Sequence, residues 1–559
     1  MTRSLRLATV VAAASLVSLV AASEASACGG TFCDTGPTAM PVDQSGENII
    51  FHIGPDQVEA HIQIQYDPDT TAEAFAWLIP VSAMPEFEVG SQLLFDATLN
   101  GSVPSYGMFQ QSDSCGQDVN LGGEDDVGGT TGQEDAGSTG TGGEQPNVYQ
   151  TTVGAFDIAV LDGGTVDSIM QWLGDNGYQQ DPNAAPIIEQ YLGEGFMFVA
   201  MKLSNDADIG EIHPIVIRYG GTEPCVPIRL TSIAALEDMD IRVFFYQDGR
   251  TVPVNYRHVL VNPLMIDWFN NADNYKEVIS LAVDADQANG HAFVTEYAGP
   301  SLVVNTFQIY SPAWNGDVFT NYVDSPVGVI EELTTQGLIS CDPIFDADCS
   351  YNHPLLQPIL AEFIPVPAGV TALDFYGCLS CYAADIDLVA WDAAAFAAAI
   401  DERIVVPANT AKALVEGNTY LTRMYTTISP SEMNEDPIFR INSTLPDVPN
   451  VRFATQTTHC NDTATVVLPD GREVFFANGL NPVWPDFPDE MPWVEDVDQE
   501  GMAENAPLIN LVDNTELINS LLDEHNAQEQ AKIPDLFESG CYCSSNGDDQ
   551  HHWLFGFAA

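Results

Sequence analysis

The sequence predicts an α+β fold with a mostly antiparallel sheet and several short helices, in two packed domains plus a disordered acidic insertion. Stretches with strand periodicity outnumber those with helical periodicity, and the two kinds do not alternate regularly along the chain. Apolar residues make up 45% of the chain, which is enough for a sizeable core. The 559 residues also exceed the length that one hydrophobic core usually serves, so more than one domain is expected.

Most of the strands are expected in the first half of the chain. Residues 58–66 alternate apolar and polar side chains, which is the period of a strand with one buried face. Residues 74–79 are an unbroken apolar run, which indicates a buried strand. Further strands of this half are expected at residues 156–161, 196–200, 215–218, 241–245 and 291–295.

Helices in the same half are marked by the residues at their ends. Thr165 is placed to cap a helix that stops at residues 176–177, where Asn is followed by Gly. A shorter helix is expected over residues 186–192, with Gly193 ending it. The pattern over residues 275–283 predicts another helical stretch.

A second α+β unit is expected over residues 311–545, after a first domain over residues 28–310. Pro326 opens a helix, and Asp392 caps an alanine-rich helix. The spacing of Asp513 and Glu516 predicts a capping box before a final helix. Strands of this unit are expected at residues 420–427, 464–467 and 474–476.

The composition changes most sharply at residues 113–147. Gly, Thr, Asp and Glu dominate this segment, and no aromatic residue occurs between Cys115 and Asn147. Such a segment does not bury enough apolar surface to order itself, so a disordered, low-complexity insertion is expected. Residues 546–559 are expected to form a loosely attached tail.

The first residues have the order of a secretory signal peptide. Two arginines precede an apolar run over residues 7–22, and an Ala-x-Ala sequence ends at Ala27. Residues 1–27 are therefore expected to be removed by cleavage between Ala27 and Cys28. The run is shorter than the roughly 20 residues of a spanning helix, and none comparable follows, so no transmembrane segment is expected. The alternative is a buried N-terminal core helix.

Cleavage before Cys28 raises the question of a lipid anchor on that residue. Bacterial lipoproteins are acylated on a cysteine in this position, but the polar pair Ser23-Glu24 separates the apolar run from the cleavage site. We therefore expect simple secretion, with a lipid anchor at Cys28 as the alternative. The expected location is the periplasm, the outer-membrane surface or the extracellular medium.

The charge of the chain excludes one class of partner. It has 80 acidic and 16 basic residues, a formal net charge of -64. Nucleic acids and anionic lipids bind through Lys and Arg, so no nucleic-acid partner is expected. The charge suits high salt, divalent cations or a cationic partner. The alternative is that acidity is a general property of the secreted proteins of one lineage.

The 11 cysteines indicate a disulfide framework, because the chain is expected to be exported. An odd number leaves one cysteine over, unless Cys28 is acylated. The alternative is a four-thiolate metal site, since Cys378 and Cys381 have redox or zinc spacing and could join Cys541 and Cys543. The disulfide candidates are Cys28, Cys33, Cys115, Cys225, Cys341, Cys349, Cys378, Cys381, Cys460, Cys541 and Cys543.

Candidate metal ligands form no complete pattern. The sequences Asp284-Ala-Asp286 and Asp346-Ala-Asp348 resemble parts of calcium loops, but the Gly and Glu positions of an EF-hand are missing. The pair His551-His552 lies in the expected tail. We therefore expect no cofactor, with calcium as the alternative.

Seven short motifs occur in order along the first part of the chain. They are CGGTFC at 28–33, PVDQSGE at 41–47, VEAHIQIQY at 58–66, FAWLIPV at 75–81, WLGDNGY at 172–178, LTSIAA at 230–235 and AFVTEYAG at 292–299. Together they resemble the bacterial family named domain of unknown function 2330, over residues 28–310. Residues 420–430 are similar to the segment after this domain in its longer members. The resemblance implies an exported protein of Gram-negative bacteria and implies no activity.

No motif of a known catalytic class occurs, such as G-x-S-x-G, H-E-x-x-H, a phosphate loop or a dinucleotide fingerprint. The 80 acidic residues supply many carboxylate pairs by chance, so such pairs carry no information. We expect a non-enzymatic, secreted or surface-associated protein of the bacterial cell envelope, with a binding or structural role toward an unidentified protein or glycan. The alternative is an extracellular hydrolase, with or without a metal, whose site the sequence does not reveal.

Overall fold

The computed structural model describes residues 44–66, 76–113, 146–178, 183–204, 211–222, 224, 226–233, 235–341, 348–501, 503 and 505–533. The expected signal peptide, most of the expected insertion and the expected tail lie outside these residues. No helix among the described residues is long and apolar enough to cross a membrane. Helices and strands are mixed, and antiparallel pairs predominate, so the predicted α+β class is confirmed.

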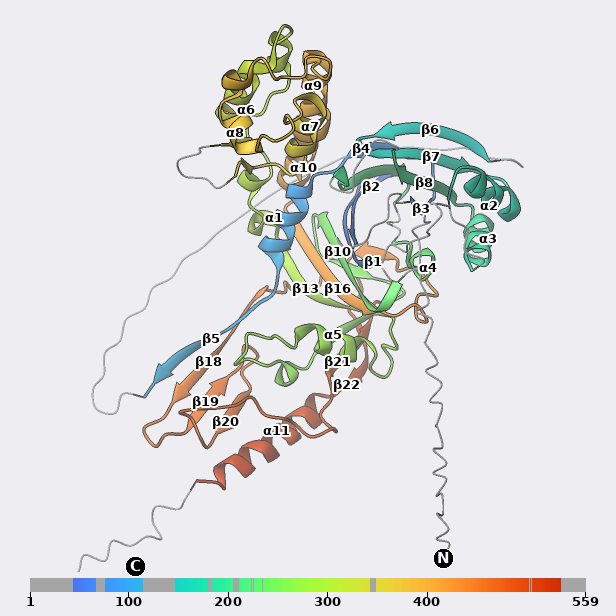
Figure 1. Cartoon of the computed structure of the whole chain (residues 1–559). Helices are drawn as coiled ribbons and strands as arrows, with labels where there is room; N and C mark the ends of the chain where they lie inside the picture. The colour runs from blue at the N-terminus through green and yellow to red at the C-terminus, as the bar shows by residue number, and fades with distance from the viewer. Residues whose placement is uncertain are drawn as a thin grey trace, which may run out of the picture.

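A ten-stranded sheet forms the centre of the molecule (Figure 1). Its strands are β1 (Gln44–Ile53), β2 (Gln57–Tyr66), β4 (Glu86–Val89), β9 (Ile215–Gly220), β10 (Ala235–Gln247), β12 (Arg257–Val261), β13 (Ala292–Pro300), β16 (Tyr420–Ile428), β21 (Val494–Gln499) and β22 (Ile509–Asp513). They lie in the order β22-β21-β12-β13-β16-β10-β1-β2-β9-β4. The pairs β1 with β10 and β12 with β13 are parallel, and the other pairs are antiparallel.

A second sheet packs on one face of the first. It contains β3 (Ala76–Val81), β6 (Asn147–Val153), β7 (Phe156–Asp162) and β8 (Met197–Leu203), in the order β3-β8-β7-β6. Ile158 and Val160 of β7 point into the space between the sheets, where they share a core with Phe51 of β1. Leu161 points the other way, against the helices α2 (Val166–Asp175) and α3 (Ala184–Glu194). Burial on both faces explains the unbroken apolar sequence of β7.

Local signals placed several helix ends correctly. The Thr165 hydroxyl accepts the Ser168 N–H at 3.3 Å, and the Ser168 hydroxyl accepts the Thr165 N–H at 2.8 Å, so the predicted cap of α2 is confirmed. Helix α5 (Tyr275–Val283) covers the predicted range. Helix α3 runs past the predicted stop at Gly193, because Gly195 is the residue that takes the left-handed conformation, with φ of 90°.

The predicted capping box at residues 513–516 is wrong. Helix α11 (Thr515–Gln530) begins after Asn514, whose side chain makes no capping hydrogen bond. Asp513 is the last residue of β22, and its carboxylate accepts the Thr515 N–H at 2.9 Å. Asp513 therefore bonds to the start of the helix from the position before the N-cap, whereas the spacing predicted Asp513 as the N-cap itself.

The opposite face of the ten-stranded sheet is covered by helices. Helices α1 (Gln92–Ser102) and α10 (Val406–Gly417) pack on Phe244 and Tyr246 of β10. Helix α5 packs farther along the same sheet. The central strand β10 is thus buried on both faces, as its run of apolar residues requires.

The chain between β13 and β16 forms a separate helical unit (Figure 1). Its helices α6 (Val329–Thr335), α7 (Leu356–Phe363), α8 (Ala372–Gly377) and α9 (Ala393–Ile400) share a core of their own. Asp392 accepts the N–H groups of Ala394 and Ala395, which confirms the predicted cap of α9. A π-helical turn (Asp401–Val405) joins α9 to α10, just before Pro407, which has no N–H to continue the α-helical ladder.

A third sheet lies at the far end from this unit (Figure 1). It contains β5 (Ser105–Ser112), β18 (Val451–Thr458), β19 (Ala464–Val467) and β20 (Glu473–Phe476), in the order β20-β19-β18-β5. Its inner face packs on Trp268 and on Ile518 and Leu522 of α11. Its strands β19 and β20 confirm two of the predicted strands.

Strands from both sides of the boundary expected at residue 310 pair with each other in two of these sheets. Strand β16 comes from the expected second unit, yet it lies between β13 and β10 of the expected first domain. Strand β5 comes from the first half of the chain and pairs with β18 of the second. The two expected units therefore share strands rather than a simple interface.

Candidate functional site

A cleft of about 1560 Å³ lies beside α3 and the short helix α4 (Ile228–Thr231). Its walls come from segments far apart in the sequence, so no local motif marks it. The lining residues are Asp56, Ser82, Ala83, Met84, Tyr149, Asp162, Gly163, Gly164, Leu192, Glu194, Gly195, Phe196, Met197, Gly220, Gly221, Thr222, Pro224, Arg229, Asn434, Glu435, Asp436, Pro437 and Ile438.

Arg229 is the only basic residue among these. Its Nη1 and Nη2 donate to the two carboxylate oxygens of Glu194 at 2.8 and 2.7 Å. Its backbone N–H and its Nε donate to the two oxygens of Asp436, each at 3.0 Å. The guanidinium carbon lies 4.1 Å from the ring centre of Tyr191, whose hydroxyl donates to Asp436 at 2.8 Å. The guanidinium of Arg229 is therefore fully occupied by groups of the protein itself.

The loop that carries Asp436 is held from the other side. The Asn255 amide donates to the backbone carbonyl of Asp436 at 2.8 Å and accepts the Ile438 N–H at 2.7 Å. The Tyr256 hydroxyl donates to the backbone carbonyl of Glu435 at 2.6 Å. These bonds fix the loop backbone, so the cleft wall it forms is preorganised.

The two carboxylates that bind Arg229 have pKa values shifted in opposite directions, one by burial and the other by its hydrogen bonds. Burial raises the pKa of Asp436 above its usual range, although Arg229 and Tyr191 oppose the shift. Glu194 is nearer to solvent, and its hydrogen bonds from Arg229 lower its pKa. The same bonds raise the pKa of Arg229, which stays charged at any physiological pH.

The other carboxylates of the cleft are not paired with Arg229. They are Asp56, Asp162 and Glu435. One buried oxygen of Asp56, Oδ2, has no hydrogen-bond partner among the described residues. Met84, Tyr149 and Ile438 add exposed apolar surface to the same walls. The cleft thus offers negative charge and apolar contact together.

Two glycines with positive φ form part of the cleft wall. Gly164 has φ of 94° and Gly221 has φ of 127°, which are left-handed conformations that glycine alone adopts at low cost. Neither places a side chain in the cleft. A ligand can therefore approach the backbone at these two positions.

A second polar cluster lies on the other face of the ten-stranded sheet. The buried His61 ring contacts Glu59 at 2.8 Å, and Arg218 joins Glu59 to Glu88 with distances of 2.5 and 2.7 Å. Burial alone would raise the pKa of Glu59, but the hydrogen bonds and charges of His61 and Arg218 lower it to about 2. Glu88 also accepts a hydrogen bond from the Thr410 hydroxyl of α10 at 3.2 Å. The cluster therefore ties β2, β4 and β9 to α10.

The structure brings some of the candidate cysteines together. Cys341 is bonded to Cys349, and Cys378 is bonded to Cys381, so the latter pair is a disulfide rather than half of a four-thiolate site. Cys460 is also disulfide-bonded. The candidates that lie outside the described residues are Cys28, Cys33, Cys115, Cys225, Cys541 and Cys543.

The acidic sequences singled out as calcium candidates do not converge. Asp284 faces Glu432 and Asp238, and burial together with these two charges raises its pKa to about 6. Asp286 instead contacts the side chain of its neighbour Gln287. Asp348 accepts the Cys349 N–H at 2.8 Å. Asp346 and the pair His551-His552 lie outside the described residues, which contain no group of three ligating side chains that could hold a metal.

No direct sequence signal marks Arg229, Glu194 or Asp436. One indirect signal exists, because a chain with 16 basic and 80 acidic residues places each arginine among many competing carboxylates. Arg229 also stands directly before the LTSIAA motif at 230–235. Only the fold shows which of the carboxylates it binds.

A family model described as "Uncharacterized protein conserved in bacteria (DUF2330)" matches residues 22–440. The chain belongs to this family. The match is longer than the expected 28–310, because it continues through the helical unit and β16. Every lining residue of the cleft falls within it. No curated protein and no solved structure matches the chain.

Proposed function

We propose that this DUF2330 protein is an exported binding protein whose cleft takes the cationic side chains of a protein partner. The observation that carries the proposal is the charge of the cleft, whose described lining residues include five carboxylates and one arginine that is already bound to two of them. Lys and Arg side chains of an incoming segment meet Asp56, Asp162 and Glu435. An anionic ligand meets repulsion from the same groups and from a net charge of -64.

The size of the cleft supports a peptide segment over a small molecule. Sites for small ligands usually measure about 300–1,000 Å³, and this cleft holds about 1560 Å³. Exposed Met84, Tyr149 and Ile438 offer apolar contact beside the carboxylates, so a segment that mixes basic and apolar residues fits best. A neutral glycan, which lacks the charge, gains nothing from the carboxylates beyond hydrogen bonds.

The arrangement of the carboxylates supports binding rather than hydrolysis. A general acid or base must be free to exchange a proton with the substrate. Glu194 and Asp436 are instead held by Arg229 and Tyr191. The His61–Glu59 pair lies on the far face of the ten-stranded sheet, away from the cleft.

The proposal places the chain outside the cytoplasm. Its support is the signal-like sequence of residues 1–27 together with the disulfides Cys341–Cys349 and Cys378–Cys381. Disulfides of this kind persist in oxidising compartments and are rare in the cytosol. The partner that binds the cleft would therefore lie in the cell envelope or in the medium.

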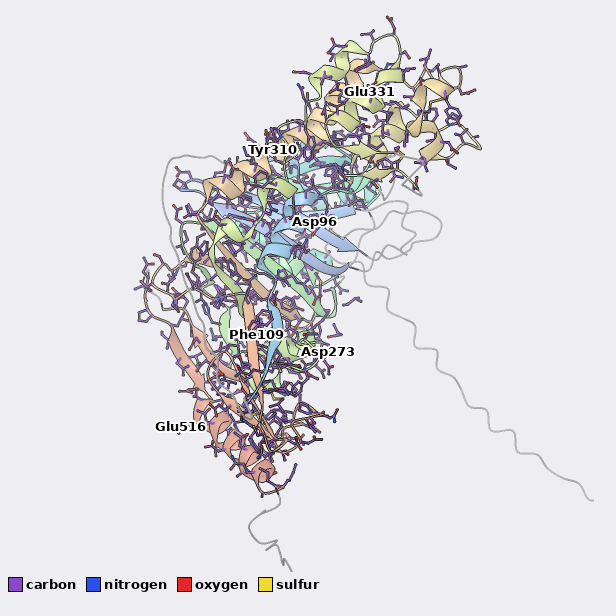
Figure 2. The ribbon with its side chains drawn as sticks, turned by 90° about the vertical axis from the view of Figure 1, so that its left-hand side faces the viewer. Asp96, Phe109, Asp273, Tyr310, Glu331 and Glu516 are labelled. Atoms are coloured by element: carbon purple, nitrogen blue, oxygen red, sulfur yellow. A yellow bond between two sulfur atoms is a disulfide. The ribbon has the colours of Figure 1, made fainter. Side chains whose placement is uncertain are left out.

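Titration calorimetry with a short lysine- and leucine-containing peptide tests the proposal. The comparison ligands are the same peptide with acetylated lysines and a neutral oligosaccharide. We expect the double variant Asp162→Asn/Glu435→Gln to bind the lysine peptide roughly tenfold more weakly, the size of a lost pair of charge-assisted contacts. The control is Glu331→Gln/Glu516→Gln, which removes the same charge at exposed positions at opposite ends of the molecule (Figure 2).

An equal loss of affinity in the two double variants would show that the peptide is held by general attraction, which refutes the cleft as its site. Equal binding of the acetylated peptide removes the electrostatic basis of the proposal. Tighter binding of the oligosaccharide assigns the cleft to glycans instead.

A further inference from the structure

Strand β5 leaves one edge of its sheet unpaired. Among the described residues, β5 pairs only with β18, and it ends the order β20-β19-β18-β5. The N–H groups of Ser105 and Asp113 bond to β18 and its flanking residue, so the odd-numbered residues face that strand. The backbone groups of Tyr106, Met108, Gln110 and Ser112 therefore point away from it. Within the part of the chain that the structure describes, no strand pairs with this edge along the eight residues of β5.

This edge lacks the features that normally protect one. Natural edge strands carry charged residues, prolines or bulges that block pairing with another strand. The sequence of β5, SYGMFQQS, has no charge and no proline, and its register with β18 is unbroken. Strand β19 has no charge either, although the whole chain carries 80 acidic residues. The other two strands carry one charge each, Arg452 on β18 and Glu473 on β20, so the four strands have no net charge in a strongly acidic protein.

The outer face of the same sheet is aromatic. Phe109 is 62% exposed, and its ring stacks on Phe453 of β18 with 5.0 Å between the ring centres. Gly107 makes this possible, because a side chain there would collide with the Phe453 ring. Val451 extends the apolar area along β18. Figure 2 shows Phe109 on the part of the molecule between Asp96 and Glu516.

One segment of the chain outside the described residues has the complementary pattern. Residues 552–559 read HWLFGFAA, in which Trp553, Phe555 and Phe557 recur at every second position. In a strand these three rings lie on one face. The segment has no charge, and its eight residues match the eight of β5.

The described chain ends on the same side of the molecule as this edge, at Ile533. Helix α11 packs against β20 and the inner face of the same sheet, and its last turn lies on the same side of the molecule as the tip of β5 (Figure 1). Trp553 is 20 positions after Ile533, and an extended chain of that length spans up to about 65 Å.

We propose that residues 552–559 add to the free edge of β5 as a fifth strand of this sheet. The backbone groups of Tyr106, Met108, Gln110 and Ser112 then bond to the added strand. The rings of Trp553, Phe555 and Phe557 cover Phe109 and Phe453, which removes apolar surface from water on both sides. The segment thereby closes an edge that otherwise invites pairing between copies of the protein.

Amide hydrogen exchange of the full chain tests the docked strand. In the variant Trp553→Ser/Phe555→Ser/Phe557→Ser, the amides of Tyr106, Met108, Gln110 and Ser112 should exchange roughly tenfold faster or more, because they lose their partners on the added strand. The control Leu388→Ser/Val389→Ser removes exposed apolar surface in the helical unit and should leave β5 unchanged. Exchange in β1 and β10 reports whether each variant keeps the fold.

A second variant tests the edge rather than the rings. Gln110→Pro removes an N–H that points away from β18, so β5 keeps its place in the sheet while pairing with a further strand is blocked. We expect faster exchange of residues 552–559 in this variant. Unprotected residues 552–559 in the unaltered chain, or β5 exchange that is the same with and without the three rings, overturns the proposal. Protection that disappears on dilution assigns the edge to a second copy and overturns it as well.

Discussion

Arg229 holds Asp436 twice, with its backbone N–H and with its Nε, each at 3.0 Å. One acidic side chain therefore fixes both the start of α4 and the orientation of the only cationic side chain among the described lining residues of the cleft. The same guanidinium stacks on Tyr191 and binds Glu194 of α3. Three segments of the chain meet at this one residue.

Replacing Arg229 should destabilise the fold. Arg229→Lys removes the two-pronged bond to Glu194 and the flat stacking on Tyr191, and a lysine ammonium restores neither. Asp436 keeps its hydrogen bonds from the backbone N–H of residue 229 and from the Tyr191 hydroxyl, so loss of the guanidinium bonds should cost roughly 2 kcal/mol in the free energy of unfolding. Urea unfolding measures the change. The matched control is Arg403→Lys, whose pair with Glu362 is more exposed and should cost less than about 1 kcal/mol. Equal losses in the two variants would contradict the assigned role.

Glu47 on β1 should make the protein more stable below neutral pH than above it. The side chain is fully buried, and neither carboxylate oxygen has a hydrogen-bond partner among the described residues. Burial raises the pKa of Glu47 from 4.5 to about 7. Between these values the unfolded chain releases a proton that the folded chain keeps, so stability falls as pH rises.

The variant Glu47→Gln isolates this contribution. Its stability relative to the unaltered chain should be constant below about pH 4.5, rise between pH 4.5 and 7, and level off above pH 7. The gain should reach about 3 kcal/mol. Urea unfolding of both chains across this range provides the measurement. A difference between them that does not vary with pH would falsify the assignment.

His213 should act in the opposite direction. Its Nδ1 donates to the Pro214 carbonyl at 2.7 Å, and its Nε2 accepts the Ala155 N–H at 3.1 Å, so the folded chain needs the neutral ring. Burial lowers the pKa of His213 to about 4, and the charge of Arg403 adds to the shift. Below pH 6.5 His213 is protonated in the unfolded chain but stays neutral in the folded chain, so stability falls as pH falls toward 4.

The variant His213→Gln keeps one donor and one acceptor without a titrating ring. As pH falls from 6.5 to 4, the free energy of unfolding should decrease less in this variant than in the unaltered chain, and the difference should reach about 3 kcal/mol. Unfolding experiments at pH 7, 5.5 and 4 compare the two chains. The same acid sensitivity in both would place the effect on other groups.

The sequence predicts those parts of the fold that local chemistry decides. Thr165 and Asp392 mark helix starts because a side-chain oxygen can satisfy N–H groups two or three residues away. Helix α5 follows from the spacing of its apolar residues alone. Asp513 shows the limit of this reasoning, because the preceding strand decided which residue stands before the helix.

The sheet order and the cleft depend on contacts between distant residues. Strand β16 enters the sheet between β10 and β13, and Arg423 of β16 pairs with Glu296 of β13 although 127 positions separate them. Arg229 is 35 positions from Glu194 and 207 from Asp436. With 80 acidic residues in the chain, nothing local distinguishes these two from the rest. The cleft therefore emerges only once the sheets are packed.

The connection between β5 and β6 should tolerate a change of sequence but not a loss of length. Asp113 follows β5 and Pro146 precedes β6, and these strands belong to different sheets on opposite sides of the molecule (Figure 1). Replacing residues 114–145 with a Gly/Ser linker of equal length should leave the melting temperature within about 2 °C, since a flexible chain spans the same distance. Joining Asp113 directly to Pro146 should broaden the unfolding transition, because one strand must leave its sheet. Sharp, unchanged melting of the short form would contradict this.

Added salt should stabilise the protein. A net charge of -64 forces carboxylates close together on the surface, and their repulsion opposes the compact state. Asp284 gives one local example, because the nearby charges of Glu432 and Asp238 add to burial in raising its pKa to about 6. Exposed charges interact over about 30 Å at 0.01 M ionic strength but over about 3 Å at 1 M. The melting temperature should therefore rise between these two sodium chloride concentrations.

The variant Asp284→Asn shows whether the salt effect acts at identified carboxylates. Removing this charge should raise the melting temperature at 0.01 M sodium chloride and should change it less at 1 M, where screening has already weakened the repulsion. Asp286→Asn, at an exposed position nearby, is the control and should have a smaller effect at low salt. Calcium at ~1 mM and constant ionic strength should add little, because Asp284 and Asp286 do not converge on one point. A melting temperature that stays flat or falls with sodium chloride refutes the repulsion argument, and a large calcium shift that Asp284→Asn abolishes would show a metal site at this loop.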